Sequence, residues 1–197
     1  MTKPKIAVVF YTTYGSNQGV AQAAAAAAEA AGAEVRLRRI AETAPEAVVQ
    51  GQEPWARQLA AMQDIPEVSA DDMEWADGYF FSAPTRFGVV ASQMRAFIDS
   101  LGPLWQKGGM ANKTFTATTS AGNLNGGQES TLLSLYTTAM HWGAIIVAPG
   151  YADPVKFEDG GNPYGYSMLP GALSETGQKS VAYQAMRLTQ MTAKLIG

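Results

Sequence analysis

The sequence contains no cysteine and only one histidine, His141, among its 197 residues. Without cysteine, the chain cannot form disulfide frameworks, zinc ribbons or iron–sulfur clusters, and it cannot use a catalytic thiol. With one histidine, a zinc site would have to be built almost wholly from carboxylates, which is rare. We therefore expect no metal site.

Charge is also sparse, with 14 lysines and arginines against 17 aspartates and glutamates, a net charge of −3. Nucleic-acid-binding proteins normally carry a basic excess, so no nucleic-acid partner is expected. No apolar run approaches the roughly 20 residues that span a bilayer. Residues 6–11, which follow Lys3 and Lys5, are too few for the apolar core of a signal peptide. These features predict a soluble cytoplasmic protein without a membrane span.

What the chain does contain is an alternation of strand and helix patterns. Five segments are predicted as strands: residues 6–11, 34–39, 78–82, 114–120 and 144–148. The first is continuously apolar, which is typical of strands buried on both faces of a parallel sheet, and the third is also predicted to be buried. Apolar residues recur at helical spacing in residues 20–31, 94–101, 132–139 and 181–195. The pattern predicts a doubly wound α/β sandwich with helices on both faces of the sheet.

We expect a single domain over residues 1–197, with an insertion at about 41–75 and a long loop at about 149–179. The insertion is broken by prolines and includes a short helix near residues 55–62. Its acidic pair, Asp71 and Asp72, is interpreted as solvated surface. The long loop is rich in glycine and proline and lacks periodicity. Such loops are usually functional or contact another chain, so we expect an interface there.

The ends of the helices carry weaker signals. Gly32 is well placed to end the first helix, because glycine readily adopts the left-handed conformation that follows many helices. Ser92 is predicted to cap the helix that includes residues 94–101.

In doubly wound sheets a ligand binds beyond the carboxyl ends of the strands, at the point where the strand order reverses. The loop at residues 12–17 offers hydroxyls, an asparagine and a glycine at a helix N-terminus, an arrangement suited to phosphate. The alternative is a helix cap with spare polar residues. The loop at 82–88 adds a cation and an aromatic side chain, and Trp105 follows. The glycines of 120–127 allow a flat ligand to approach the backbone closely. Together these parts fit flavin mononucleotide (FMN) better than a dinucleotide.

Other nucleotide and catalytic motifs are absent. Gly15 is the sole glycine of the first loop, so the dinucleotide pattern G-x-G-x-x-G is missing. Asn112 stands before Lys113 and Thr114, where a P-loop requires glycine. No G-x-S-x-G elbow is present. The loops hold no acid–base pair, and His141, taken alone, is interpreted as a packing or capping residue. We therefore expect no catalytic side chain.

Five short motifs together resemble one family. They are PTRFG at 84–88, SQMRAF at 92–97, LW at 104–105, GGQE at 126–129 and GNPYG at 161–165. As a set they resemble the WrbA-type NAD(P)H:quinone oxidoreductases of the flavodoxin-like group. The resemblance extends from Lys5 to Leu195 and includes the insertion.

The resemblance implies a flavodoxin-like sandwich whose five parallel strands are ordered 2-1-3-4-5. It also implies non-covalent FMN and a homotetramer whose active sites are shared between subunits. The implied activity is reduction of quinones by NADH or NADPH, by ping-pong hydride transfer through the flavin, which carries the chemistry. The residues that would contact FMN are Thr12, Thr13, Tyr14, Gly15, Ser16, Asn17, Pro84, Thr85, Arg86, Phe87, Gly88, Ser120, Ala121, Gly122, Asn123, Leu124, Asn125, Gly126 and His141.

In the same resemblance, Tyr14 and Trp105 would meet the nicotinamide or the quinone. Arg86 would stabilise the negative charge of the two-electron-reduced flavin. Two alternatives stay open: a non-enzymatic flavodoxin that transfers electrons, and a binding or regulatory protein that has lost tight FMN. A dehydrogenase with its own dinucleotide site is less supported, because the first loop lacks the glycines.

Overall fold

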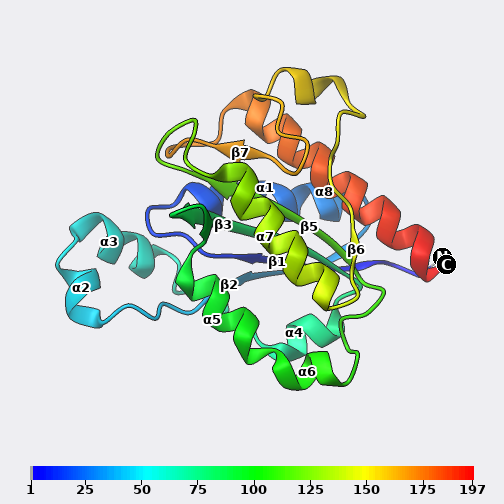
Figure 1. The fold of residues 1–197 in the computed structure, drawn as a ribbon, viewed down its shortest axis with the longest axis horizontal. Coiled ribbons are helices and arrows are strands. Elements are labelled where there is room, and N and C mark those ends of the chain that lie inside the picture. Colours follow the sequence, from blue (N-terminus) through cyan, green and yellow to red (C-terminus); the bar gives the residue numbers. More distant parts are fainter. Residues whose placement is uncertain (1) are drawn as a thin grey trace.

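The computed structural model describes residues 2–197 and shows one twisted sheet between two layers of helices (Figure 1). Five strands run parallel in the order β2-β1-β3-β5-β6. They are β1 (Lys5–Phe10), β2 (Glu34–Arg39), β3 (Gly78–Arg86), β5 (Thr114–Ser120) and β6 (Ile145–Ile146). Counted along the chain, this is the predicted order 2-1-3-4-5, so the predicted fold class is confirmed.

Two short strands were not predicted. β4 (Val89–Val90) pairs antiparallel with the end of β3, and β7 (Ser167–Met168) pairs with the end of β5. β3 is also longer than predicted, so residues 83–86 belong to the strand rather than to a loop. In contrast, the last predicted strand, 144–148, is reduced to β6.

Alternate residues of β1 face opposite sides of the sheet, as the period of a strand requires. Ile6 and Val8 pack with α1 (Ser16–Ala30) and α8 (Glu175–Ile196). Ala7 and Val9 belong to the core that includes α5 (Ser92–Ser100) and α7 (Gln128–His141). The sheet is thus covered on both faces, and α6 (Gly102–Gln106) lies beside α5 (Figure 1).

Two predicted helix boundaries need comment. Gly32 lies just past α1 with φ +96°, so it ends that helix as predicted. Ser92 is not a cap but the first residue of α5, and Ala91 takes the cap position. The Ser92 hydroxyl donates instead to the Gln93 side chain at 3.2 Å.

The two irregular segments contain more structure than the sequence predicted. The insertion holds α2 (Glu46–Gln50), α3 (Glu53–Ala61), which matches the predicted short helix, and α4 (Ala70–Trp75). In the loop at 149–179, a 3-10 turn (Pro154–Phe157) and β7 are formed, and α8 begins at Glu175. Tertiary pairing, rather than local periodicity, organises both segments.

Asp72 is buried, so its interpretation as solvated surface is wrong. It forms a capping box with Ser69 at the start of α4. Its two oxygens each lie 3.0 Å from a guanidinium nitrogen, one of Arg36 and one of Arg38. The carboxylate therefore anchors α4 to β2. None of the helices described for residues 2–197 combines the length and the apolar character that a membrane span needs.

Candidate functional site

A cleft opens where β1, β3 and β5 end, at the point where the strand order reverses. We call it the switch-point cleft; its volume is about 370 Å³. It is lined by Thr12, Thr13, Tyr14, Ser16, Asn17, Pro84, Thr85, Arg86, Ser120, Ala121, Gly122 and Pro170. All of these except Pro170 were predicted from the sequence. The structure thus brings the three predicted loops together around one space, as the rule for doubly wound sheets requires.

The first loop ends at the N-terminus of α1. Gly15 caps the helix with φ 98°, a left-handed conformation that glycine adopts without strain, and its N–H donates to Thr12 Oγ1 at 3.0 Å. The first amides of a helix lack partners within it and carry partial positive charge. Thr12, Thr13 and Ser16 line the cleft beside them. Such an arrangement is suited to an anion such as phosphate.

Asn17, on α1, links that helix to two of the strands that end at the cleft. Its side chain is only 1% exposed. Its Nδ2 donates to Ser82 Oγ at 3.1 Å, and its Oδ1 accepts from Ser120 Oγ at 2.7 Å. The Asn17 side chain, which was predicted to contact the cofactor, therefore forms hydrogen bonds that join α1 to β3 and β5.

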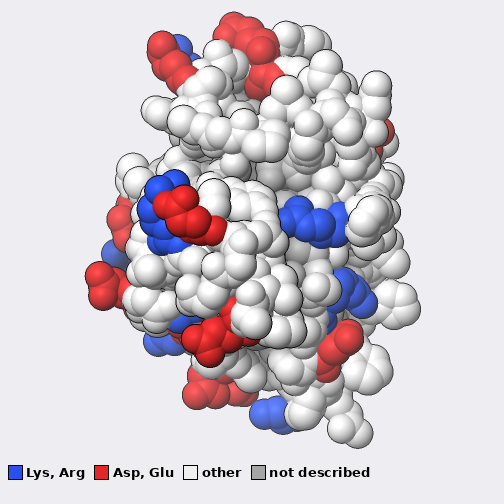
Figure 2. Space-filling view, turned by 90° about the vertical axis from the view of Figure 1, so that its left-hand side faces the viewer, with Lys and Arg blue, Asp and Glu red and all other residues white. Residues whose placement is uncertain are grey.

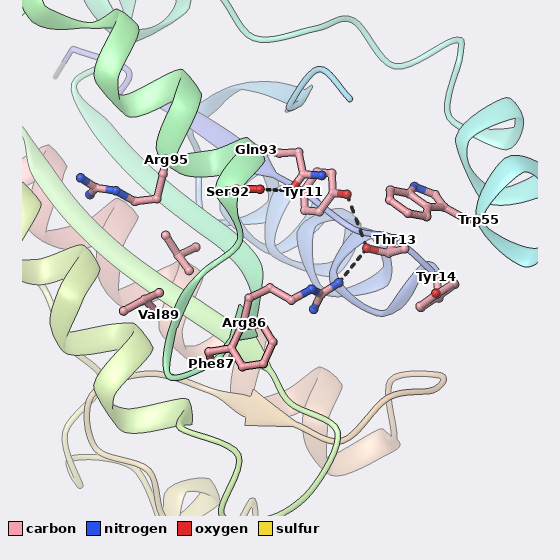
Figure 3. A pocket seen from close by; sticks show the side chains of 11 residues that line it. Tyr11, Thr13, Tyr14, Trp55, Arg86, Phe87, Val89, Ser92, Gln93 and Arg95 are labelled. Carbon is pink, nitrogen blue, oxygen red and sulfur yellow. Dashed lines mark hydrogen bonds between the residues drawn. The ribbon is translucent and has the colours of Figure 1, made fainter. Parts of the chain in front are cut away.

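Arg86 brings a positive charge to the cleft from the end of β3. Its Nη2 donates to Thr13 Oγ1 at 2.9 Å (Figure 3), and its Nη1 donates to the Thr85 carbonyl oxygen at 3.0 Å. Two bonds in one guanidinium leave further N–H groups for a ligand, because arginine carries five donors. The guanidinium therefore links the first and second predicted loops.

A second space adjoins the first, because Thr13, Tyr14 and Arg86 line both. We call it the aromatic cleft; its volume is about 630 Å³. It is lined by Tyr11, Thr13, Tyr14, Trp55, Arg86, Phe87, Val89, Val90, Ser92, Gln93 and Arg95 (Figure 3). Spaces of about 300–1,000 Å³ with apolar walls and a few polar groups are typical of small-molecule sites.

Two aromatic rings stand at the mouth of these clefts. Tyr14 is 57% exposed, and its hydroxyl donates to Gln52 Oε1 at 2.8 Å. Phe87 is fully exposed and has φ 52°, a left-handed conformation that is rare for a bulky residue. Strained backbone that exposes an apolar ring is a common feature of ligand sites.

Sequence reasoning missed the acidic residue of this region. Glu42, in the insertion, accepts hydrogen bonds from Tyr11, Trp55 and Gln93, which all line the aromatic cleft. Burial raises the pKa of Glu42, but hydrogen bonds from the Ala44 N–H and from these side chains outweigh it, so the pKa lies below its usual range. No motif marks Glu42, because its partners are distant in the sequence.

The rest of the predicted loop at 120–127 turns away from the switch-point cleft. The Gly126 N–H donates to the Asn123 carbonyl oxygen at 3.2 Å, closing a turn that leaves Leu124 exposed. Leu124 and Asn125 line a different hollow, beside residues 159–162 and 167–169. Gly88 lies against the first turn of α7, since its carbonyl oxygen accepts from Ser130 Oγ at 2.7 Å.

Trp105 and His141 lie elsewhere in the chain. The Trp105 indole donates to the His141 carbonyl oxygen at 2.8 Å. His141 ends α7, whose 14 residues extend about 21 Å from the loop at its start. It lines a shallow groove with Val89, Arg95 and three hydroxyl-bearing residues of α7. Within one chain, Trp105 and His141 therefore do not reach the switch-point cleft, although both were predicted as site residues.

The edge that carries the clefts is weakly charged. Figure 2 views the molecule from this side and shows scattered acidic and basic side chains among mostly uncharged surface. Among residues 2–197, no group of three or more histidine, aspartate or glutamate side chains is placed to hold a metal ion. The site combines hydrogen-bond donors suited to an anion with flat apolar surfaces.

Known proteins resemble this chain in sequence and in fold. Residues 4–155 match the family model described as NADPH-dependent FMN reductase. A protein of Deinococcus radiodurans named NAD(P)H dehydrogenase (quinone) is 54% identical over 100% of both chains. A Geobacter metallireducens protein of the same name is 37% identical over 98% of this chain and 100% of its own.

Among solved structures, a WrbA-like flavodoxin from Agrobacterium tumefaciens has a TM-score of 0.69, with 22% identity over 98% of this chain and 99% of its own. A flavodoxin from the domain Archaea has a TM-score of 0.64, with 14% identity over 96% and 99%. At these identities the likeness establishes the flavodoxin-like fold alone. Together with the match over residues 4–155, these findings show that the chain belongs to the NADPH-dependent FMN reductase family.

Proposed function

We propose that this chain catalyses the FMN-dependent two-electron reduction of quinones by NADH or NADPH, as a WrbA-type enzyme. The observation that carries the proposal is the switch-point cleft, where a helix N-terminus, three hydroxyl-bearing residues and Arg86 adjoin exposed aromatic rings. The relatives named NAD(P)H dehydrogenase (quinone) support the same activity.

The residues present fit FMN. The α1 amides, Thr12, Thr13 and Ser16 would hold the phosphate, since they offer donors at a helix N-terminus. Residues 85–87 would line one side of the ring, and residues 120–122 the other. When bound, FMN takes two electrons from the nicotinamide and gives them to the quinone.

The chain itself supplies position and charge. Arg86 is fixed by Thr13 and Thr85, so its positive charge is preorganised to stabilise negative charge that develops beside it. Tyr14 and Phe87 present flat faces on which planar rings would stack. Both substrates are planar and would use the same surface in turn, which gives ping-pong kinetics. No side chain is required as an acid or a base.

The active form would be a cytoplasmic homotetramer of single-domain subunits, with each site completed by a neighbouring subunit. Trp105 and His141, which lie apart from the cleft of their own chain, would reach the cleft of a neighbour. The segment at about 149–179 would contribute to the interface. Its Tyr151 and Phe157 rings stack with centroids 5.4 Å apart, and both are exposed.

An anaerobic titration separates this function from that of an electron-transfer flavodoxin. Purified protein with FMN is titrated with NADH, and benzoquinone is then added. The proposed enzyme loses its flavin absorbance in proportion to NADH and regains it rapidly on quinone addition. Retention of the absorbance in the presence of NADH would contradict the proposal and favour a flavodoxin. Failure to bind FMN would favour a binding or regulatory protein.

A further inference from the structure

Glu42 receives hydrogen bonds on both carboxylate oxygens. Its Oε1 accepts from the N–H groups of Thr43 and Ala44, each at 2.9 Å, and from Gln93 Nε2 at 2.7 Å. Its Oε2 accepts from the Tyr11 hydroxyl at 2.9 Å and from Trp55 Nε1 at 3.1 Å. The ion pairs formed among residues 2–197 do not include Glu42. Neutral donors alone therefore hold this negative charge.

The three side-chain donors come from three separate elements. Tyr11 directly follows β1, Trp55 lies on α3 of the insertion, and Gln93 lies on α5. All three side chains line the aromatic cleft (Figure 3). Glu42 thus joins the insertion to the body of the fold at the wall of this cleft.

A directed chain of hydrogen bonds connects Glu42 with the switch-point cleft. Arg86 Nη2 donates to Thr13 Oγ1 at 2.9 Å, and the Thr13 hydroxyl donates to the Tyr11 oxygen at 3.5 Å (Figure 3). Tyr11 in turn donates to Glu42. Each hydroxyl both accepts and donates, so the chain is polarised from the cation to the anion. Such chains reinforce their members in a low-dielectric site.

Tyr11 keeps its proton in this series of hydrogen bonds. Burial raises its pKa far above the usual range, so the hydroxyl stays a donor to Glu42 at any physiological pH. If Glu42 lost its charge, it would become a weaker acceptor for the Tyr11 hydroxyl, which could then turn toward Thr13. The bond between Thr13 and Arg86 would then compete with a new donor.

We propose that Glu42 is a positioning residue for the site. Through Tyr11 and Thr13 it fixes the Arg86 guanidinium at the switch-point cleft, and through Trp55 and Gln93 it holds the wall of the aromatic cleft. The proposal rests on the proposed function, because it assigns FMN to the first cleft and part of the quinone to the second. Glu42 lines neither cleft, so it would act through its neighbours.

The central test compares Glu42→Gln with Glu46→Gln. Glutamine keeps the size of the side chain, but its NH₂ group faces donors that need an acceptor. Glu46 is exposed on α2 in the same insertion, so its variant carries the same charge change without the network. Titration of each full-length protein with FMN, followed by flavin fluorescence, gives the dissociation constant. The KM for benzoquinone and kcat are measured at saturating FMN.

For Glu42→Gln we expect an FMN dissociation constant raised about tenfold, equivalent to about 1.4 kcal/mol. The KM for benzoquinone should rise several-fold, whereas kcat should change little. The fluorescence of Trp55, assigned by comparison with Trp55→Phe, should shift as its hydrogen bond is lost. Glu46→Gln should match the parent in all three readouts. Equal FMN and benzoquinone constants in the two variants would overturn the proposal.

Tyr11→Phe distinguishes the effect of Glu42 on Arg86 from its effect on Trp55 and Gln93. It also tests the proposal if Glu42→Gln fails to fold. This variant removes the hydrogen bonds that connect Glu42 with Thr13 and Arg86, but it keeps the hydrogen bonds of Trp55 and Gln93 to Glu42. FMN should bind about tenfold more weakly, with unchanged Trp55 fluorescence. An unchanged FMN constant overturns the positioning of Arg86. FMN binding and Trp55 fluorescence do not depend on turnover, so a failure of the quinone reductase activity is distinguishable from a failure of this inference.

Discussion

The indole of Trp105 donates a 2.8 Å hydrogen bond to the carbonyl oxygen of His141, which joins α6 to the end of α7. This pair is distant from the switch-point cleft of its own chain, although the sequence predicts both residues as site contacts. If a neighbouring chain completes each site, Trp105→Ala should lower kcat/KM about tenfold, the effect of losing one stacked ring. FMN should stay bound. Steady-state kinetics and flavin content measure the two effects.

Mixed oligomers provide the control for shared sites. Trp105→Ala and Arg86→Ala are co-expressed with different tags and purified through both. A cleft with Arg86 from one chain and Trp105 from its partner is intact in such a mixture. The specific activity should therefore exceed the mean of the two single variants. An activity equal to that mean would show that each chain forms its site alone.

Asn17 provides a test of how the cleft is held together. Asn17→Ala leaves the buried hydroxyls of Ser82 and Ser120 without their partner. We expect a loss of about 2–3 kcal/mol in the free energy of unfolding, because unsatisfied buried polar groups cost about 1–3 kcal/mol each. Urea denaturation measures it. Asn125→Ala, which removes an exposed amide from the neighbouring loop, should cost less than about 0.5 kcal/mol. Equal losses would mean that the Asn17 bonds do not stabilise the cleft.

The sheet and most of the switch-point cleft could be predicted from local patterns. The apolar runs at 6–11 and 78–82 identify central strands, and the topology then brings residues 12–17, 84–86 and 120–122 together. The extension of β3 through Pro84 was missed, because proline usually ends a strand. Pro84 is accommodated near the carboxyl end, where it aligns with Ser120 of β5.

The features that were missed depend on contacts between distant residues. β7 exists because Ser167 aligns with Thr119 of β5, and two residues carry no periodicity. The insertion looks irregular in sequence because Asp72 and Glu42 find their partners in other elements. The predicted roles of Trp105 and His141 come from a family resemblance, and the structure of one chain does not test them.

Asp72 gives a prediction about pH. Burial raises its pKa, but hydrogen bonds from Arg38, the Ser69 N–H and Arg36 outweigh burial, so the folded pKa lies below the usual range. The resulting stabilisation is fully present above the unfolded pKa, about 3.9. It is lost as the pH falls through the lower folded pKa. At pH 7, Asp72→Asn should lose about 2 kcal/mol of unfolding free energy.

The difference between Asp72→Asn and the parent should therefore shrink as the pH falls below about 4. Urea denaturation at pH 7, 5, 4 and 3 follows this change. Asp71→Asn is the matched control, because Asp71 precedes Asp72 on α4 but is exposed. Its effect should be small at every pH. A constant difference between Asp72→Asn and the parent across this range would count against the lowered pKa.

Substitution of Phe87 distinguishes an effect on ligand binding from an effect on the stability of the fold. Its ring is fully exposed and its backbone is left-handed, with φ 52°. Phe87→Gly relieves strain of about 1 kcal/mol, which roughly offsets the extra backbone entropy of glycine, about 0.5–1 kcal/mol. The free energy of unfolding should therefore change by less than about 1 kcal/mol. The KM for benzoquinone should rise about 2–12-fold, because a stacked ring contributes about 0.5–1.5 kcal/mol.

Asn112→Gly is the control for the backbone effect, since Asn112 also has a left-handed backbone, with φ 63°. It precedes β5 at the opposite end of that strand from the switch-point cleft. Its stability change should be similar in size to that of Phe87→Gly, and its KM should match the parent. Phe87→Ala, which keeps the backbone strain but removes the ring, should reproduce the rise in KM. If Phe87→Ala leaves KM unchanged, the exposed ring does not contact the quinone, and the strain at Phe87 needs a different explanation.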